Sequence, residues 1–253
     1  MSQQHDLNEK VAVVTGGCGG LGQAIAQKLT ALGGRVVITD LDEERGAALA
    51  AATGCQFFQQ DVSRESDWLA LKSWLVERFG GLQVLVNNAA ILRAYNVETE
   101  TLEDFNRVMA VNCQSVFLSH KHLLGLMAAS GGSIVNISSS SAMTGHPQFC
   151  AYTASKAAVR SLTMNTAVYA RKQGYGVRCN SVHPDGIMTP MVMDIPGEPP
   201  AMSDEQRATA AGFTAHPEAI ADVVVFLASD DSRHINGAAI AVDNTSTITP
   251  PYV

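Results

Sequence analysis

The chain has 253 residues, of which 46% are apolar and 16% charged, and this length with an even composition favours one globular domain over residues 1–253. Its formal net charge of −7 and its scattered lysines and arginines exclude a nucleic-acid partner, whose phosphates need clustered basic residues. No apolar run is long enough to span a membrane and residues 1–9 lack the pattern of a signal peptide, so we expect no membrane partner and a cytoplasmic location.

Short apolar strands alternate with helices along the first third of the chain. Residues 10–15 form a β-branched apolar run, a glycine-rich turn follows, and residues 21–32 carry apolar side chains at helical spacing. The same alternation predicts strands at 35–39, 56–59 and 83–86 and helices at 42–52 and 65–79. Continuous apolar strands between helices are typical of a parallel sheet covered on both faces.

The alternation continues to the end of the chain with one interruption. We expect one or two helices over 102–127, strands at 133–137, 177–182 and 238–242, and helices at 151–172 and 217–228. Residues 188–214 hold four prolines and four methionines and break the rhythm, so we interpret them as an irregular lid or substrate loop. The fold predicted for the whole chain is an α/β Rossmann-type, doubly wound parallel sheet of about seven strands.

The five cysteines are an odd number and contain no C-x-x-C pair. This pattern disfavours structural disulfides and a zinc site, and we expect no metal. Cys18 and Cys150 lie near the motifs described below, but a small buried hydrophobic side chain is the simpler interpretation of both.

The glycine-rich turn runs from Thr15 to Gly22 between the first predicted strand and helix. Glycine lets the backbone turn tightly and approach a pyrophosphate, and the following helix N-terminus attracts the anion. Strand, spacing and helix together predict a dinucleotide site. The residues that we expect to contact the cofactor here are Gly16, Cys18, Gly20, Leu21 and Gly22.

Asp40 closes the second predicted strand, 24 residues after Gly16. Its carboxylate can accept hydrogen bonds from the ribose hydroxyls of the adenosine half and would repel a 2′-phosphate. Cys18, Gly19 and Leu41 offer no cation for such a phosphate, so we predict NAD as the cofactor, with Leu41 beside it. The alternative is that Asp40 merely caps the helix that begins near residue 42.

Tyr152 and Lys156 are four residues apart at the start of a predicted helix and therefore share one face. A phenol has a pKa of about 10, and a neighbouring ammonium and a positively charged nicotinamide ring would both favour phenolate. Such a pair is most often solvated when it stands alone. Here a run of four serines, 138–141, lies just past a predicted strand, where open parallel sheets bind ligands, although such a run can also be a plain polar loop. The residues by themselves do not select one serine, and Ser139, 13 residues before Tyr152, is selected by the resemblance that follows.

Together these motifs resemble the classical short-chain dehydrogenase/reductase family. The resemblance covers nearly the whole chain, in order and spacing: the glycine turn, Asp61-Val62, Asn87-Asn88-Ala89-Ala90, Asn112, Ser139, Tyr152, Lys156 and residues 184–189. One departure is that Asp185 and Gly186 follow Pro184 where the family has glycine directly.

The resemblance implies roles for these residues. Tyr152 would be the general acid/base, and Ser139 would hydrogen-bond the substrate oxygen. Lys156 would lower the tyrosine pKa and bind the nicotinamide ribose. Asn112 would hold a water molecule of a proton relay. The cofactor contacts are Asp61 and Val62 at the adenine, Asn88, Ala89 and Ala90 along the adenosine half, and Pro184, Ile187 and Thr189 at the nicotinamide. The implied assembly is a homotetramer.

Residues 171–191 and 241–244 resemble bacterial 3β/17β-hydroxysteroid dehydrogenases, but much of these segments packs the scaffold. The substrate residues that we expect are Ser139, Ser141, His146, Phe149, Tyr152, Met188 and Met191, a mostly apolar set without a lysine or arginine for an acidic substrate. We therefore predict the interconversion of a bulky apolar secondary alcohol and its ketone, and hydroxysteroids are candidates for this substrate. The alternatives are a smaller alcohol and, less favoured, a non-redox family member.

Overall fold

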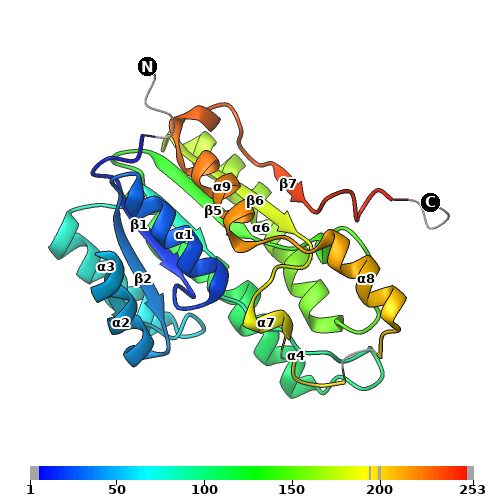
Figure 1. Cartoon of the computed structure of the whole chain (residues 1–253). Helices are drawn as coiled ribbons and strands as arrows, with labels where there is room; N and C mark the ends of the chain where they lie inside the picture. The colour runs from blue at the N-terminus through cyan, green and yellow to red at the C-terminus, as the bar shows by residue number, and fades with distance from the viewer. Residues whose placement is uncertain (1–5, 194, 199–200, 250–253) are drawn as a thin grey trace.

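The computed structural model describes residues 6–193, 195–198 and 201–249, and at positions 193 and 206–209 only the backbone. Seven parallel strands form one sheet in the order β3-β2-β1-β4-β5-β6-β7 (Figure 1). The strands are β1 (Val11–Thr15), β2 (Arg35–Asp40), β3 (Gln56–Gln59), β4 (Val84–Asn87), β5 (Gly132–Ile137), β6 (Val177–Pro184) and β7 (Ala239–Val242). The predicted doubly wound sheet is confirmed, and its strand order reverses between β1 and β4.

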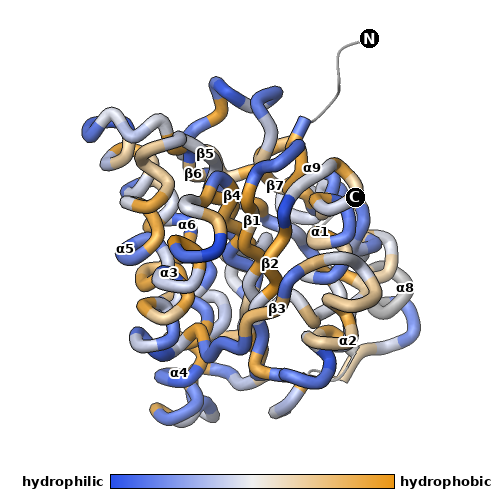
Figure 2. The backbone as a smooth tube through the Cα atoms, turned by 90° about the vertical axis from the view of Figure 1, so that its left-hand side faces the viewer, coloured by the Kyte–Doolittle hydropathy of each residue, from blue (hydrophilic) through white to orange (hydrophobic). Residues whose placement is uncertain are grey.

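Helices cover both faces of this sheet, as Figure 2 shows edge-on. The helices are α1 (Gly20–Ala31), α2 (Glu43–Thr53), α3 (Glu65–Phe79), α4 (Leu102–Met109), α5 (Ser115–Met127), α6 (Cys150–Gln173), α7 (Pro190–Met193), α8 (Asp204–Phe213) and α9 (Pro217–Ala228). One buried apolar cluster joins α1 and α9 to the sheet, and a second joins α3, α5 and α6 to its other face. Strand side chains therefore point alternately into two separate cores.

The predicted helix over 102–127 is a single rod with a π-helical segment, η1 (Ala110–Gln114), between α4 and α5. Such π segments are rare and frequently mark functional sites. This one carries Asn112, which is 1% exposed.

The prediction of an irregular segment over 188–214 is wrong in part, because the segment contains α7 and α8. The residues that flank it are joined by a short bridge between Ile187 and Ala215, and a second bridge joins Gly197, in its interior, to Ala94. Both bridges lie at the carboxyl end of the sheet, so this segment covers the edge at which the strand order reverses (Figure 1).

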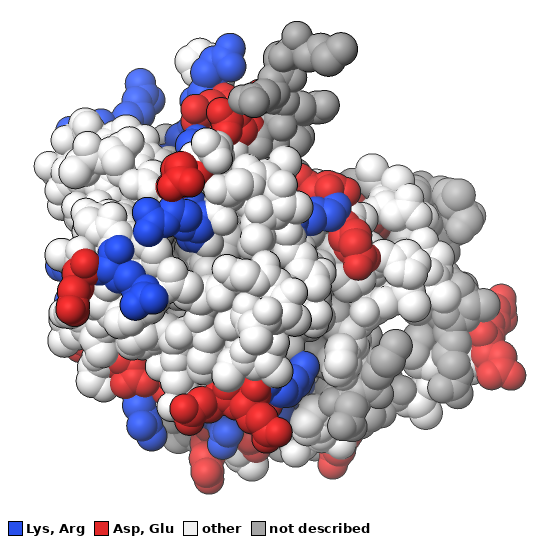
Figure 3. All heavy atoms as spheres, turned by 60° about the vertical axis from the view of Figure 1, so that its left-hand side comes forward, with Lys and Arg blue, Asp and Glu red and all other residues white. Residues whose placement is uncertain are grey.

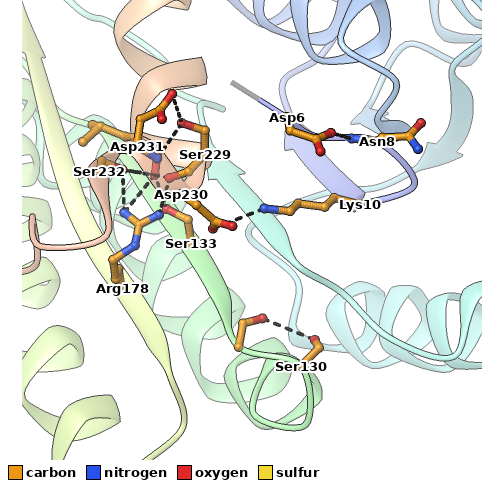
Figure 4. Close-up of polar contacts among 12 residues, drawn as sticks. Asp6, Asn8, Lys10, Ser130, Ser133, Arg178, Ser229, Asp230, Asp231 and Ser232 are labelled. Atoms are coloured by element: carbon orange, nitrogen blue, oxygen red, sulfur yellow. Dashed lines mark hydrogen bonds and ion pairs between the residues drawn. The ribbon is translucent and has the colours of Figure 1, made fainter. Parts of the chain in front are cut away.

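The opposite edge of the sheet is fixed by Arg178 of β6 (Figure 4). Its guanidinium donates to the Leu227 and Ser229 carbonyl oxygens and to Ser232 Oγ at 2.8 to 3.0 Å. The two carbonyl oxygens lie at the C-terminal end of α9, where a cation is favourable. Arg178 thus has a structural role far from the predicted site.

Charged side chains of both signs are interspersed on the face in Figure 3, without a broad basic field. Among the described residues, no helix is long and apolar enough to cross a membrane. All five cysteines are free thiols, and the described part of the chain holds no group of three or more metal-ligating side chains.

Candidate active site

A cavity of about 350 Å³ opens at the carboxyl ends of the central strands, where parallel sheets bind ligands. The predicted cofactor residues that line it are Gly16, Gly20, Leu21, Gly22, Asp40, Leu41, Val62, Asn88, Ala89, Ala90, Pro184, Ile187 and Thr189. The predicted catalytic residues Ser139, Tyr152 and Lys156 line it as well, and Met191 adds an apolar wall. Segments far apart in sequence therefore meet in one site.

The glycine turn leaves room for a pyrophosphate because its glycines carry no side chains. Gly16 has a φ of 63°, and a Cβ on Gly22 would stand 2.2 Å from the Gly16 carbonyl oxygen. Gly19 is the N-cap of α1 and provides no side-chain cap, so the first N–H groups of the helix are left for an anion. Asn88 Nδ2 donates to the Thr15 and Gly16 carbonyl oxygens and holds the turn in place.

Asp40 faces this turn. Its Oδ2 accepts from the Cys18 N–H at 3.0 Å, and its Oδ1 accepts from the Leu41 N–H at 2.8 Å. The N-cap of α2 is Asp42, which accepts from the Arg45 N–H, so the alternative that Asp40 caps this helix is wrong. Cys18 itself does not line the cavity.

Arg45 brings to the adenosine end a cation that the sequence analysis missed. It lines the cavity, and one guanidinium N–H donates to the Cys18 carbonyl oxygen at 2.8 Å. The inference that no cation stands near Asp40 is therefore wrong. Arg45 lies in the first turn of α2, whose N-terminus shares the sheet edge with Asp40, and that proximity was the available signal.

At the end of the cavity where the adenine is predicted to bind, Val62 lines the cavity but Asp61 does not. Asp61 Oδ1 accepts from the backbone N–H and the hydroxyl of Ser63, and Oδ2 lies 3.3 Å from Arg64 Nε. The neighbouring Gln60, which the sequence analysis did not select, lines the cavity in its place.

The Lys156 ammonium is held by a backbone carbonyl oxygen beside the Tyr152 ring. Lys156 is 2% exposed, and its Nζ donates to the Ile137 carbonyl oxygen at 2.8 Å while lying 5.5 Å from the centroid of the Tyr152 ring. Ser138 Oγ donates to the Lys156 carbonyl oxygen and fixes this turn of α6 against β5. The predicted common face of Tyr152 and Lys156 is confirmed.

Burial dominates the acidity of both groups. It raises the pKa of Tyr152 to about 12, with an opposing hydrogen-bond contribution from Ser139, and lowers the pKa of Lys156 to about 8. Burial is the largest influence on the phenol pKa, and a lowering of this pKa by the lysine stays a prediction. Low-dielectric surroundings penalise both charged forms, so a further positive charge in the site would favour phenolate.

Ser139 is held in an extended conformation at the end of β5. Its hydroxyl accepts from the Ser141 N–H, and its carbonyl oxygen accepts from His183 Nδ1 at 2.9 Å. His183 Nε2 in turn lies 2.8 Å from Ser181 Oγ. Burial lowers the pKa of His183, which keeps the ring neutral with its proton on Nδ1. The sequence analysis missed this support because His183 belongs to a strand interior.

The Asn112 side chain is engaged with protein groups. Its Oδ1 accepts from the Ile91 N–H, and its Nδ2 donates to the Ile91 carbonyl oxygen and to Ser155 Oγ. Asn112 does not line the cavity and instead anchors the loop after β4 beside the catalytic helix. A role in a proton relay stays a prediction.

The predicted substrate residues are only partly brought together. The rings of His146 and Phe149 stack at 4.2 Å between centroids, and Phe149 meets the Tyr152 ring edge-on at 6.5 Å. His146 is exposed and lines a neighbouring hollow, as a surface histidine would, and Met188 is 46% exposed. Ser141, His146, Phe149 and Met188 lie outside the wall of the main cavity.

The residue that departs from the family pattern, Asp185, lines the cavity beside the catalytic serine loop. It accepts a hydrogen bond from Ser140 Oγ at 3.1 Å. The following segment is fixed because the Ala215 N–H donates to the Gly186 carbonyl oxygen and the Met188 N–H to that of Ala215.

Comparisons with known proteins agree with this geometry. A family model described as enoyl-(acyl carrier protein) reductase matches residues 17–246. The chain is 42% identical over 246 residues to a 3-beta-hydroxysteroid dehydrogenase of Comamonas testosteroni, covering 94% of this chain and 96% of that protein. It is 38% identical to an NADP-dependent (R)-specific alcohol dehydrogenase of Lentilactobacillus kefiri, covering 95% and 98%.

A solved structure is also similar. The ligand-free aldohexose dehydrogenase of Thermoplasma acidophilum superposes with a TM-score of 0.85 at 28% identity, covering 98% of this chain and 97% of that one. The similarity extends over the complete sheet and its helices.

Proposed function

Because the chain belongs to the short-chain dehydrogenase/reductase family, whose members use a nicotinamide cofactor, we propose that it interconverts a bulky apolar secondary alcohol and its ketone with NAD. The observation that carries this proposal is the meeting of Ser139, Tyr152 and Lys156 in one cavity with the glycine turn. A bound nicotinamide supplies the hydride acceptor for the alcohol carbon.

The protein's own residues supply the proton chemistry. Tyr152 Oη removes the hydroxyl proton of the alcohol during oxidation and returns it during ketone reduction. Ser139 holds the substrate oxygen at this phenol, and His183 holds Ser139 through its carbonyl. Lys156, fixed by Ile137 and Ser138, brings an ammonium to the ribose side of the phenol. The positive charge of an oxidised nicotinamide ring would offset the burial that raises the pKa of Tyr152.

The preference for NAD rests on Asp40. Its carboxylate stands at the adenosine end, where it would accept hydrogen bonds from ribose hydroxyls and repel a 2′-phosphate. Arg45 works against this preference, because a guanidinium is a strong phosphate ligand. Both side chains bond Cys18, Asp40 through its N–H and Arg45 through its carbonyl oxygen, and the proposal of NAD rests on the Asp40 carboxylate at the end of β2.

A bulky apolar substrate is supported by the cavity wall, to which Met191, Val111 and Ile91 contribute apolar surface. Asp185 is the acidic exception and would disfavour an acidic substrate. One relative is a 3-beta-hydroxysteroid dehydrogenase, which supports a hydroxysteroid. The relative that is an alcohol dehydrogenase supports the alternative of a smaller secondary alcohol.

The test is a panel of alcohols and ketones followed at 340 nm with NAD and NADP. Turnover of hydroxysteroids or similarly bulky cyclic alcohols with NAD is expected, and turnover of only short polyols or acyl-carrier substrates would refute the substrate assignment. In the same assay, Tyr152→Phe should lower kcat by at least about 100-fold, because the acid/base group is lost, with little change in the Kd for NADH. The matched control is Tyr175→Phe, which removes a hydroxyl outside the cavity.

We further propose a homotetramer in which α5 and α6 form one interface. Phe117 of α5 and Met164, Val168 and Tyr169 of α6 are between 44% and 57% exposed. An apolar surface of this kind on two neighbouring helices is typical of a protein interface. The cytoplasmic location stays a prediction from the sequence.

A further inference from the structure

Gln60 is a buried polar residue on the proposed cofactor cavity, and its side-chain amide has no hydrogen-bond partner. It follows β3, is 1% exposed, and lines the cavity next to Asp40, whose carbonyl oxygen accepts from the Gln60 N–H. Neither Nε2 nor Oε1 of its side chain has a hydrogen-bond partner. Buried amides are nearly always paired, because an unpaired one lowers stability. Among the unpartnered buried side chains in the described part of the chain, Gln60 is the one on this cavity.

The neighbouring carboxylate is already engaged. Asp61 accepts two hydrogen bonds from Ser63 and lies against Arg64, and it does not line the cavity. A base at this end of the cavity would lie beside Gln60 and Val62, which both line it, and would displace no hydrogen bond of Asp61.

We propose that the Gln60 carboxamide hydrogen-bonds the adenine base of the cofactor, an inference that rests on the proposed function. Adenine presents an amino donor beside a ring-nitrogen acceptor, and a carboxamide offers the complementary acceptor and donor. Folding has already removed water from this amide, so its hydrogen bonds to the base are gained without a further loss of its hydration. Gln60 is a positioning residue for the dinucleotide.

The test compares a dinucleotide with a mononucleotide that lacks adenine. The variant Gln60→Leu keeps the size of the side chain and removes both polar atoms. Its Kd for NADH, measured by nicotinamide fluorescence, should rise by about 10-fold, the loss of a good hydrogen-bond pair. Its Kd for reduced nicotinamide mononucleotide should stay unchanged. The isosteric Gln60→Glu removes only the donor and should also weaken NADH selectively.

The unfolding temperature distinguishes a binding role of Gln60 from a purely structural one, in which its replacement would lower that temperature. Leucine replaces an unpaired amide, so the unfolding temperature of Gln60→Leu without cofactor should not fall. Gln56→Leu, at the other end of β3, is the matched control and should bind NADH as the wild type does. A lower unfolding temperature with an unchanged NADH-to-mononucleotide ratio would overturn the proposal, as would equal weakening of both ligands.

Binding of NADH and NADPH to the wild type and the variants distinguishes failure of the proposed function from failure of the role of Gln60. A wild-type protein that binds neither NADH nor NADPH overturns the proposed function together with the role of Gln60. A wild type that binds NADH, with Gln60→Leu and Gln60→Glu binding it equally well, overturns the role of Gln60 alone.

Discussion

At the scale of single residues, burial determines the pKa values of the two groups in the site that are proposed to carry charge. Tyr152 and Lys156 lie in surroundings that favour their neutral forms, with a pKa of about 12 for the phenol and about 8 for the ammonium. His183 and Ser138 fix the backbone on which Ser139 and Lys156 are placed. The residues therefore have defined positions before a ligand binds, and their charges depend on it.

The buried ammonium gives a prediction for the pH dependence of stability. The pKa of Lys156 is lowered on folding, so between about pH 8 and 10.5 the unfolded chain binds the extra proton and stability rises with pH. Lys156→Met lacks this contribution, so the unfolding free energy of the wild type minus that of the variant should increase from about pH 7 to about pH 10. Urea unfolding of both proteins without cofactor measures it. Lys172→Met, on the exposed end of the same helix, is the control, and a flat difference would contradict the burial of a charged lysine.

Cofactor choice is also decided by single residues. Asp40→Ser removes the carboxylate that opposes a 2′-phosphate and leaves the Arg45 guanidinium in the cavity. The ratio of kcat/KM for NADP to that for NAD should rise by about 10-fold or more, since one charged contact at such a site contributes at least about 1.4 kcal/mol. The double variant Asp40→Ser with Arg45→Leu should lose most of this gain. An equal gain in both variants would show that Arg45 does not reach the phosphate.

At the scale of elements, the turn before α1 is determined by contacts that only glycine allows. A Cβ on Gly22 would overlap the Gly16 carbonyl oxygen, which is backbone and cannot rotate away. The same helix needs its first N–H groups uncapped for an anion. Strand, turn and helix are thus one unit whose shape serves binding.

Two glycine-to-alanine variants test whether the turn requires glycine, one in the turn and one at an ordinary exposed helix position. Gly22→Ala should abolish measurable NADH binding and lower stability, because the turn must shift to admit the methyl group. Gly125→Ala lies on the exposed side of α5 with open space around the added methyl and should raise stability by about 0.5 to 1 kcal/mol. Fluorescence titration and thermal unfolding report both effects. Wild-type NADH affinity in Gly22→Ala would contradict the close-packed turn.

At the scale of the whole molecule, the sheet collects residues from the entire chain at one edge, and the surface proposed for assembly lies elsewhere. The segment with α7 and α8 covers the cavity side, whereas Arg178 and its partners stabilise the opposite edge (Figures 1 and 4). The exposed apolar residues on α5 and α6 belong to neither edge. Binding and assembly are therefore separable.

This separation predicts the behaviour of an interface variant. Val168→Asp places a charge on the apolar surface of α6 and should reduce the mass in solution from four times 26.8 kDa to that of a smaller species. Sedimentation analysis measures the mass. Leu69→Asp on α3, which is 49% exposed, should leave it unchanged. A wild type that sediments as a monomer would contradict the proposed interface.

The sequence by itself determined the alternation of strands and helices, the doubly wound sheet and the catalytic spacing, because these depend on local periodicity and on short motifs. Segments 56–59, 65–79 and 217–228 were predicted with their observed bounds. Only the tertiary structure decided which side chains face the cavity. Arg45 enters it across a turn, Gln60 lines it in place of Asp61, and His183 reaches Ser139 from another strand. Such contacts join residues distant in sequence, and the pKa of Tyr152 follows from burial, which periodicity does not specify.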